Sequence, residues 1–101
     1  VVLGQCALDL GRAQLFGPDG IEIPISTQEY LLLKVFVENP NRVLSRDEIL
    51  NLTNSRDWEG NDRSVDIRIA RLRRKIETHP NKPQTIKTVR GAGYLFAKPR
   101  T

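Results

Sequence analysis

The stretch RSVDIRIARLRRKIE, residues 63–77, carries five arginines and one lysine. On a helix, successive residues turn by about 100°, so residues that share a face recur every three or four positions. The apolar residues of the stretch recur in this way, and they are Val65, Ile69, Leu72 and Ile76. The stretch therefore predicts an amphipathic helix whose apolar stripe faces the core.

The rest of this helix surface is basic, with one apolar residue in its middle. Its residues fall into three groups: opposite the stripe Arg63, Ile67, Ala70 and Arg74, on one flank Ser64, Arg68, Arg71 and Lys75, and on the other Asp66, Arg73 and Glu77. A solvated face would explain Arg73, because Glu77 lies one turn further on. It would not explain the basic flank, which has no acid within a turn on its own side, or the exposed Ile67. This pattern favours a helix in the DNA major groove, where an apolar side chain meets thymine methyl groups and arginines bind guanine edges and phosphates.

Charge is distributed unevenly along the chain. Residues 1–62 hold five Lys/Arg against ten Asp/Glu, whereas residues 63–101 hold eleven against two. Clustered positive charge raises the local concentration of polyanions and the rate of encounter with them. We expect nucleic acid as the partner rather than an acidic membrane. RNA is disfavoured, because the chain has no aromatic stacking platform and the A-form major groove is too narrow for a helix.

Several classes of protein are disfavoured by composition. No apolar run approaches the ~18 residues of a membrane-spanning helix, and the first residues lack a signal-peptide pattern. Cys6 is the only cysteine and His79 the only histidine, so we expect no disulfide, no metal site and no catalytic residues. The sequence predicts a cytoplasmic protein that is not an enzyme and needs no cofactor.

The length of 101 residues suits a single domain, 1–101, in three parts. Residues 1–25 hold short alternating runs that predict antiparallel strands at 6–10, 12–16 and 21–25. Residues 26–78 hold three helices. Residues 84–98 alternate about Gly91-Ala92-Gly93, as a β-hairpin does. The predicted fold class is α+β with a three-helix centre.

Two capping boxes mark the starts of the first two helices. Ser26 with Glu29, and Ser45 with Glu48, each place a serine N-cap three residues before a glutamate. The helices are expected at about 27–38, 46–52 and 62–78, with a short extended link at Val43-Leu44 and a cap at Asn61 or Asp62. In the first helix the residues expected to be buried are Tyr30, Leu33, Phe36 and Val37.

Three segments in register resemble the winged-helix effector domain of OmpR/PhoB-type response regulators. They are LSRDEIL at 44–50, DRSVDIRIARLRRKIE from 62 and IKTVRGAGYLF from 86. The helix start STQEY and the N-terminal strands match too, so the resemblance covers essentially the whole chain, and HPNKP at 79–83 is most like the OmpR branch. The resemblance implies a winged helix-turn-helix with a four-stranded N-terminal sheet, a third helix that recognises DNA and a C-terminal hairpin, the wing.

The resemblance also implies which residues bind. On the recognition helix the matching DNA-facing positions are Arg63, Ser64, Asp66, Ile67, Arg68, Arg71, Arg73 and Arg74, with Arg71 the strongest candidate for reading bases. On the wing, Thr88 and Tyr94 match phosphate contacts and Arg90 a minor-groove contact. The loop 53–61 matches one that contacts RNA polymerase in several members, and its candidate residues are Arg56, Asp57, Trp58 and Glu59. For Trp58, the only tryptophan in the chain, packing of this loop onto the second and third helices is favoured over a contact with polymerase or DNA.

Two positions depart from the family pattern. Ala70 stands where a longer polar residue is frequent, so one phosphate contact is expected to be missing. Arg68 stands where His or Gln is frequent, and it could supply that contact instead.

The implied function is transcriptional regulation by sequence-specific binding to double-stranded DNA, within a bacterial two-component (phosphorelay) system. Two copies are implied on direct-repeat half-sites. Such domains follow a receiver that a sensor kinase phosphorylates, and we expect no receiver within this chain. The alternative is a winged helix used mainly for protein contacts, or one belonging to a membrane-tethered activator. The exposed arginines argue against pure protein binding.

Overall fold

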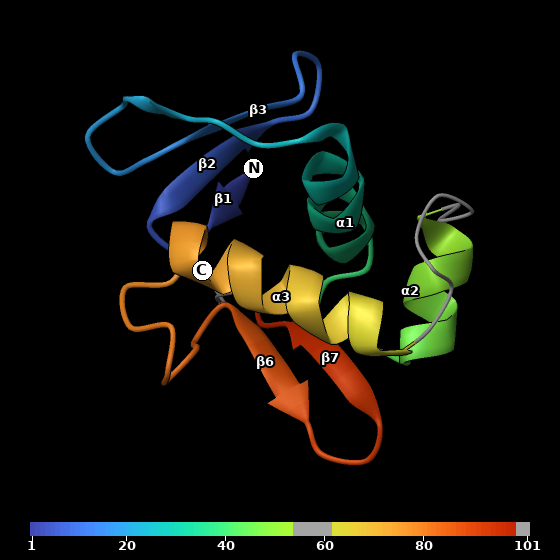
Figure 1. Cartoon of the computed structure of the whole chain (residues 1–101). Helices are drawn as coiled ribbons and strands as arrows, with labels where there is room; N and C mark the ends of the chain where they lie inside the picture. The colour runs from blue at the N-terminus through green and yellow to red at the C-terminus, as the bar shows by residue number, and fades with distance from the viewer. Residues whose placement is uncertain (54–61, 99–101) are drawn as a thin grey trace.

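The computed structural model describes residues 1–53 and 62–98. In chain order its elements are β1 (Val2–Leu3), β2 (Cys6–Asp9), β3 (Gln14–Phe16), β4 (Glu22–Ile23), α1 (Thr27–Glu38), β5 (Val43–Leu44), α2 (Arg46–Leu52), α3 (Asp62–Ile76), β6 (Ile86–Val89) and β7 (Gly93–Phe96). This order confirms the predicted fold class, an N-terminal antiparallel sheet followed by three helices and a hairpin (Figure 1). Among the described residues, no helix is long and apolar enough to cross a membrane.

The N-terminal strands form a meander in the order β1-β2-β3-β4, and every neighbouring pair is antiparallel. One face of this sheet is apolar, and its buried residues are Leu3, Cys6, Leu8 and Leu15. At the predicted turn before β4, the Asp19 carboxylate accepts the Ile21 N–H at 3.0 Å and Gly20 has a φ of 79°. The strand patterns thus predicted β2, β3 and β4, whereas β1 was implied only by the family resemblance.

Both predicted capping boxes are present. At the start of α1, Ser26 Oγ accepts the Glu29 N–H at 3.1 Å, and Glu29 Oε1 accepts the Ser26 N–H at 2.9 Å. At the start of α2, Ser45 and Glu48 exchange the same two bonds at 3.1 and 3.2 Å. These bonds satisfy N–H groups that have no partner within the helix, which is why the sequence locates both helix starts so well.

The buried face of α1 differs from the prediction. Leu33 and Phe36 are buried as expected, but Tyr30 and Val37 are only half-buried. The prediction missed Leu32 and Val35, which are buried with Glu29. The reason is that α1 contacts α2 on one side and β7 on another, so its buried face is broader than a single stripe.

The wing is part of a larger sheet than the sequence predicted. Val43-Leu44, expected as an extended link, forms β5 and pairs with β7, giving a three-stranded sheet in the order β5-β7-β6. Gly93 makes this close pairing possible. A Cβ atom at Gly93 would lie 2.0 Å from the Leu44 carbonyl oxygen, and its φ of 140° disfavours any other residue.

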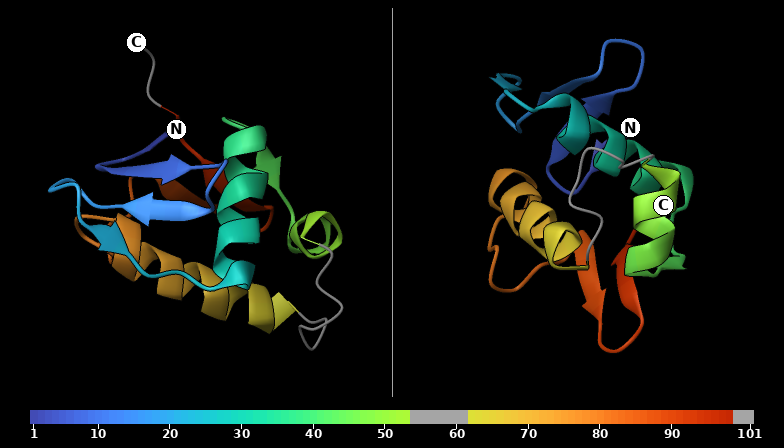
Figure 2. Two further views of the ribbon diagram at one scale, coloured as in Figure 1. Left: turned by 90° about the horizontal axis from the view of Figure 1, so that it is seen from above. Right: turned by 45° about the vertical axis from the view of Figure 1, so that its right-hand side comes forward.

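Helix α3 crosses α1, and the β6–β7 hairpin extends beyond the helices (Figure 2). The helix ends at Ile76, two residues before the predicted end near Thr78. The next residue, Glu77, is buried and accepts the N–H groups of Thr85 and Ile86 at 3.1 and 2.8 Å. Glu77 therefore closes the connection from α3 to β6. The predicted cap Asn61 lies outside the described residues.

Candidate nucleic-acid interface

The outward face of α3 presents an apolar centre among arginines. The stripe predicted as core is fully inside, because Val65, Ile69, Leu72 and Ile76 are at most 1% exposed. On the opposite face Ile67 is 44% exposed. The positions around it are exposed too, namely Arg63, Ala70, Arg71 and Arg74. This face therefore combines cations that suit phosphates with an apolar group that suits a base methyl.

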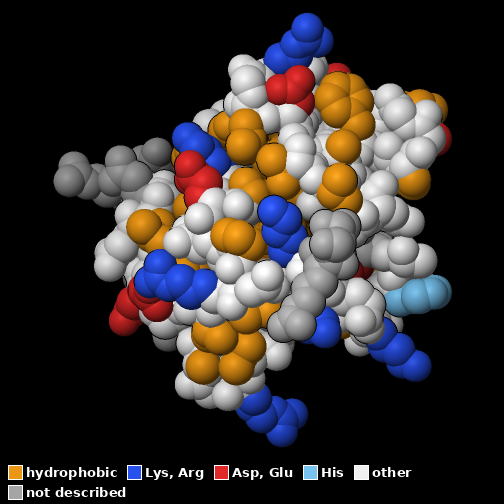
Figure 3. All heavy atoms as spheres, turned by 180° about the vertical axis from the view of Figure 1, so that it is seen from behind, with side chains coloured by type: hydrophobic (Ala, Val, Ile, Leu, Met, Phe, Trp, Pro, Cys, Tyr) orange, Lys and Arg blue, Asp and Glu red, His pale blue; other side chains and the backbone are white. Residues whose placement is uncertain are grey.

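The side of the molecule away from α3 has a mixed surface. Figure 3 shows acidic and basic side chains there, interspersed with hydrophobic ones. A mixed surface attracts a polyanion less than a cluster of exposed arginines does. The exposed Arg63, Arg71 and Arg74 of α3 therefore favour the α3 side as the nucleic-acid interface.

The flank of α3 that faces α1 borders a basic hollow of about 470 Å³. Its lining residues are Ser26, Glu29, Arg68, Arg71, Arg74 and Lys75. Lys75 Nζ lies 2.9 Å from Glu29 Oε1 and also donates to the Pro24 carbonyl at 2.8 Å. The flank has no acid within a turn on α3 itself, but α1 supplies one to Lys75 from 46 positions away in the chain.

Glu29 stays ionised in this setting. Its burial favours the neutral acid, but hydrogen bonds from the Ser26 backbone and from Lys75, together with the lysine's charge, outweigh that burial. The pKa of Glu29 is therefore lowered. The Glu29–Lys75 pair neutralises one of the cations on the α3 surface.

The flank of α3 that faces the wing is a hydrogen-bonded network. Asp66 accepts two bonds from Arg46 of α2, at 2.9 and 3.2 Å, and a third from the Tyr94 hydroxyl of β7. Arg73 donates to the Ile86 carbonyl and to the Thr88 hydroxyl, both at 2.8 Å through one nitrogen. Its guanidinium also lies over the Tyr94 ring, 5.5 Å from the centroid. Arg73 thus binds the wing, rather than forming the pair with Glu77 that a solvated helix face would have explained.

The network shifts the protonation of its members. The hydrogen bond from Arg46 is the main cause that lowers the pKa of Asp66. Burial raises the pKa of Tyr94, and its bond to the Asp66 carboxylate raises it further. Burial also lowers the pKa of Arg73, although the guanidinium keeps its charge at any physiological pH. Asp66 is therefore a carboxylate and Tyr94 a neutral donor near neutral pH.

The turn of the wing carries cations beyond the body of the domain. Lys87, Thr88 and Arg90 are exposed. The Ala92 N–H donates to the Val89 carbonyl at 2.9 Å, and Gly91 has a φ of 76°. A positive φ at the third residue is what a type II turn requires. Arg90 is the second residue of this turn and so lies at its tip.

The structure divides the predicted site residues into two sets. One set consists of Arg63, Ile67, Arg71, Arg74 and Arg90, whose side chains are exposed, together with the half-buried Ser64 and Arg68. The other set belongs to the hydrogen-bonded network between α3 and the wing and consists of Asp66, Arg73, Thr88 and Tyr94. Within this second set Thr88 is exposed, whereas Tyr94 is only 5% exposed. The predicted polymerase-contact residues Arg56, Asp57, Trp58 and Glu59 lie outside the described residues.

Sequence reasoning missed Arg46 and Glu29 as partners of α3. A signal for the first was present, because Asp66 and Glu77 are the only acids after residue 62. An isolated acid in a basic helix predicts a cation from another element. The sequence does not say which element supplies it.

A family model described as "Transcriptional regulatory protein, C terminal" matches residues 20–96. The chain belongs to this family. Regulatory protein VirG of Agrobacterium fabrum is 47% identical over 89 residues, which are 88% of this chain and 35% of VirG. The chain thus spans about a third of the length of the curated VirG relatives that it matches.

Solved structures agree with the family. The DNA-binding domain of Klebsiella pneumoniae RstA, in complex with the RstA box, has a TM-score of 0.80 at 33% identity and covers 96% of this chain and 95% of that chain. The effector domain of BfmR from Acinetobacter baumannii has a TM-score of 0.80 at 36% identity, with coverage of 96% and 88%. DrrB, an OmpR/PhoB homolog of Thermotoga maritima, has a TM-score of 0.82 at 32% identity, with coverage of 97% and 44%. The chain is a winged-helix effector domain of the OmpR/PhoB type, a DNA-binding class of transcriptional regulator domains.

Proposed function

We propose that this domain reads duplex DNA in two places at once, with α3 in the major groove and the β6–β7 turn at the minor groove. The observation that carries this proposal is the exposed Ile67, set between Arg63, Arg71 and Arg74 on one face of α3. A helix with its side chains is about 10–12 Å wide, and the major groove of B-DNA is about 12 Å wide. The face can therefore enter the groove with its cations toward the phosphates.

The exposed residues divide between reading and positioning. Arg71 and Ile67 are the proposed base contacts, because an arginine can bind guanine through two bonds and an isoleucine can meet a thymine methyl group. Arg63, Arg68 and Arg74 are the proposed phosphate contacts, which set the register of the helix on the duplex. Arg90 at the wing tip is the proposed minor-groove contact.

For Asp66, Arg73 and Tyr94 the proposal assigns another role. Their polar groups are already bonded to one another or to Arg46 and the wing backbone, so we assign them to holding the wing against α3. Thr88 is shared between these roles, because its side chain is exposed while its hydroxyl accepts from Arg73.

The proposal extends to the partners of the domain. RstA of Klebsiella pneumoniae has been solved with its DNA box. We propose that two copies of this domain occupy direct-repeat half-sites about 10 base pairs apart, since one helical turn brings the same groove back to the same side. We also propose that RNA polymerase contacts the segment 53–61, and that a sensor kinase acts only through a separate receiver.

Selection of binding sites from random duplex DNA tests this proposal. The wild-type domain should enrich one motif that contains two copies spaced by about one helical turn. Arg12→Ala, which removes a cation from the exposed β2–β3 turn, should enrich the same motif. If no motif is enriched, the domain does not read sequence, and the protein-contact alternative is favoured.

A further inference from the structure

Arg46 lies in the first turn of α2, outside the two parts of the domain proposed to contact DNA, which are α3 and the β6–β7 wing. Hydrogen bonds nevertheless link it to both of them. Its Nε lies 2.9 Å from Asp66 Oδ1 and its Nη2 lies 3.2 Å from Asp66 Oδ2. Two parallel bonds between a guanidinium and a carboxylate fix the angle between the two groups as well as their distance. Arg46 therefore holds the Asp66 side chain in one orientation on α3.

Asp66 in turn binds the wing. Its Oδ1, which accepts from Arg46, also accepts the hydroxyl of Tyr94 on β7. The Tyr94 ring lies under the Arg73 guanidinium, and Arg73 donates to the Ile86 carbonyl through Nε at 3.0 Å and through Nη2 at 2.8 Å. Side chains thus form a continuous path from α2 through α3 to both strands of the hairpin.

The charge of Asp66 supports the same conclusion. It stands among the arginines of α3, where an unpaired carboxylate would repel the phosphates of DNA. Arg46 cancels this charge and occupies both carboxylate oxygens. With Tyr94 on the same carboxylate, Asp66 is better placed to hold the wing than to accept a hydrogen bond from a base.

We propose that Arg46 is a positioning residue for DNA binding. It acts through Asp66 and Tyr94 to set the wing relative to α3, and it does not itself bind DNA. This inference rests on the proposed two-groove function. In B-DNA the distance from a major-groove site to the adjacent minor groove is set by the duplex, so both contacts form together only if the protein holds its two parts at that distance.

The Arg46–Asp66 ion pair is too exposed to contribute much to the stability of the fold. Both side chains of the Arg46–Asp66 pair are about two-fifths exposed, at 43% and 39%. Exposed ion pairs contribute little to stability, because water competes for both charges. The loss of Arg46 should therefore leave the domain folded while changing how its parts are placed.

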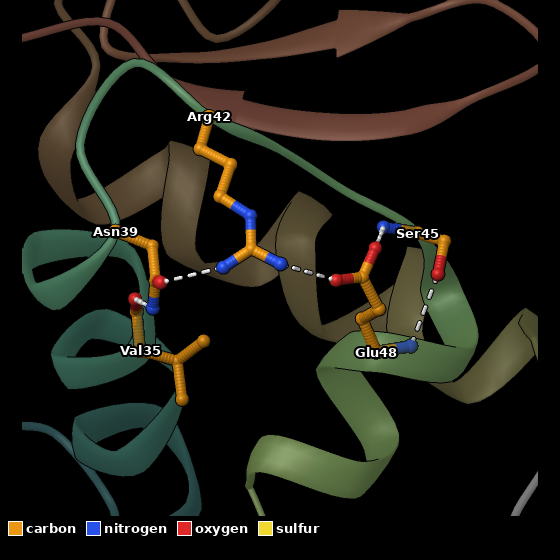
Figure 4. A network of polar contacts seen from close by, with 5 residues as sticks. All are labelled: Val35, Asn39, Arg42, Ser45 and Glu48. Carbon is orange, nitrogen blue, oxygen red and sulfur yellow. Dashed lines mark hydrogen bonds and ion pairs between the residues drawn. The ribbon is translucent and has the colours of Figure 1, made fainter.

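The domain contains a matched control pair. Arg42 binds Glu48 at 2.9 Å and Asn39 at 3.1 Å, and these residues join α1, β5 and α2 (Figure 4). Like Arg46, Arg42 is an exposed arginine in an ion pair, but its bonds go to Asn39 and Glu48, which belong neither to α3 nor to the wing. Arg42→Ala removes the same charge and a similar ion pair, but one that does not connect α2 to α3 or to the wing.

The experiment measures affinity for the selected duplex, its salt dependence and thermal unfolding. The variants are Arg46→Ala, Arg46→Lys, Arg42→Ala and Arg90→Ala, and the double variant Arg46→Ala/Arg90→Ala. We expect Arg46→Ala to weaken binding about tenfold, while its unfolding temperature stays near that of Arg42→Ala. Arg46→Lys should also weaken binding, because an ammonium cannot make the two parallel bonds. Arg42→Ala should bind like wild type.

The double variant separates positioning from direct contact. If Arg46 acts through the wing, Arg90→Ala should cause little further loss in the Arg46→Ala background. If the two losses add, and the salt slope falls by about two units, then Arg46 binds a phosphate itself and the proposal is wrong. Wild-type binding by Arg46→Lys would reject it in the same way, as would equal binding by Arg46→Ala and Arg42→Ala.

The outcome also distinguishes this inference from the function on which it rests. If Arg90→Ala changes neither affinity nor salt slope in the wild-type background, the minor-groove contact is absent and both proposals fail. If Arg90→Ala has its expected effect and Arg46→Ala has none, only the role of Arg46 fails.

Discussion

Lys75 of α3 and Glu29 of α1 form an ion pair of 2.9 Å between residues 46 positions apart. The glutamate oxygen in this pair, Oε1, also accepts the Ser26 N–H of the capping box at 2.9 Å. One atom therefore both completes the start of α1 and ties that helix to the recognition helix. The contribution of Glu29 to stability should therefore depend on its negative charge as well as on its hydrogen bonds.

Glu29→Gln tests that sensitivity. The amide can retain a capping bond but loses the charge that binds Lys75, so the free energy of unfolding at pH 7 should fall by about 1–2 kcal/mol. Because the pKa of Glu29 is lowered in the folded protein, the unfolded chain takes up its proton first as the pH falls. The contribution of Glu29 should be complete above about pH 5 and lost progressively below it. Denaturation by urea at several pH values measures this, and an unchanged acid dependence in Glu29→Gln would contradict it.

Arg71→Ala should weaken binding to the selected DNA site by about 1–3 kcal/mol and binding to random duplex far less. The reason is that a base contact distinguishes sequences, whereas a phosphate contact does not. Titrations of both duplexes, with Arg12→Ala as the control for lost charge, measure the difference. An equal loss on both duplexes would make Arg71 a phosphate contact.

Ile67→Ala should alter specificity without altering stability. Ile67 is 44% exposed, so its truncation should change the free energy of unfolding by less than about 0.5 kcal/mol. Without its branched side chain the contact with a thymine methyl group weakens, and the preference at one base pair should relax. Site selection with this variant measures the preference. A motif identical to that of wild type would remove Ile67 from the base contacts.

Arg90→Ala should lower the slope of log affinity against log salt by about one unit, because one fewer counterion is released on binding. The slope is obtained from titrations at several salt concentrations. Arg12→Ala should leave it unchanged, since Arg12 lies on the N-terminal sheet side of the domain. A slope equal to that of wild type would place the wing tip outside the interface.

Gly93→Ala should destabilise the domain by about 3 kcal/mol or more, because its Cβ would lie 2.0 Å from the Leu44 carbonyl oxygen. Gly91→Ala is the matched control, since nothing lies within 4 Å of a Cβ there and only the positive φ is unfavourable. That variant should cost about 1 kcal/mol. Thermal unfolding compares the two, and equal losses would show that contact with β5 does not decide the effect at Gly93.

The sequence predicted the features that depend on residues close together in the chain. Ser26 with Glu29 and Ser45 with Glu48 located two helix starts, because a capping box is complete within four residues. The stripe from Val65 to Ile76 identified the buried side of α3, and with it the exposed Ile67, because the helix period alone determines which residues share a face.

Tertiary structure alone decided the pairings between distant segments. The periodicity of α1 did not reveal that a second face is buried, and Val43-Leu44 gave no sign of which strand it would join. The partners of Lys75 and Asp66 come from α1 and α2, at separations of 46 and 20 positions. A charged side chain can pair with any opposite charge that the fold brings within reach, so its partner depends on how the helices pack and not on its own neighbours in the sequence.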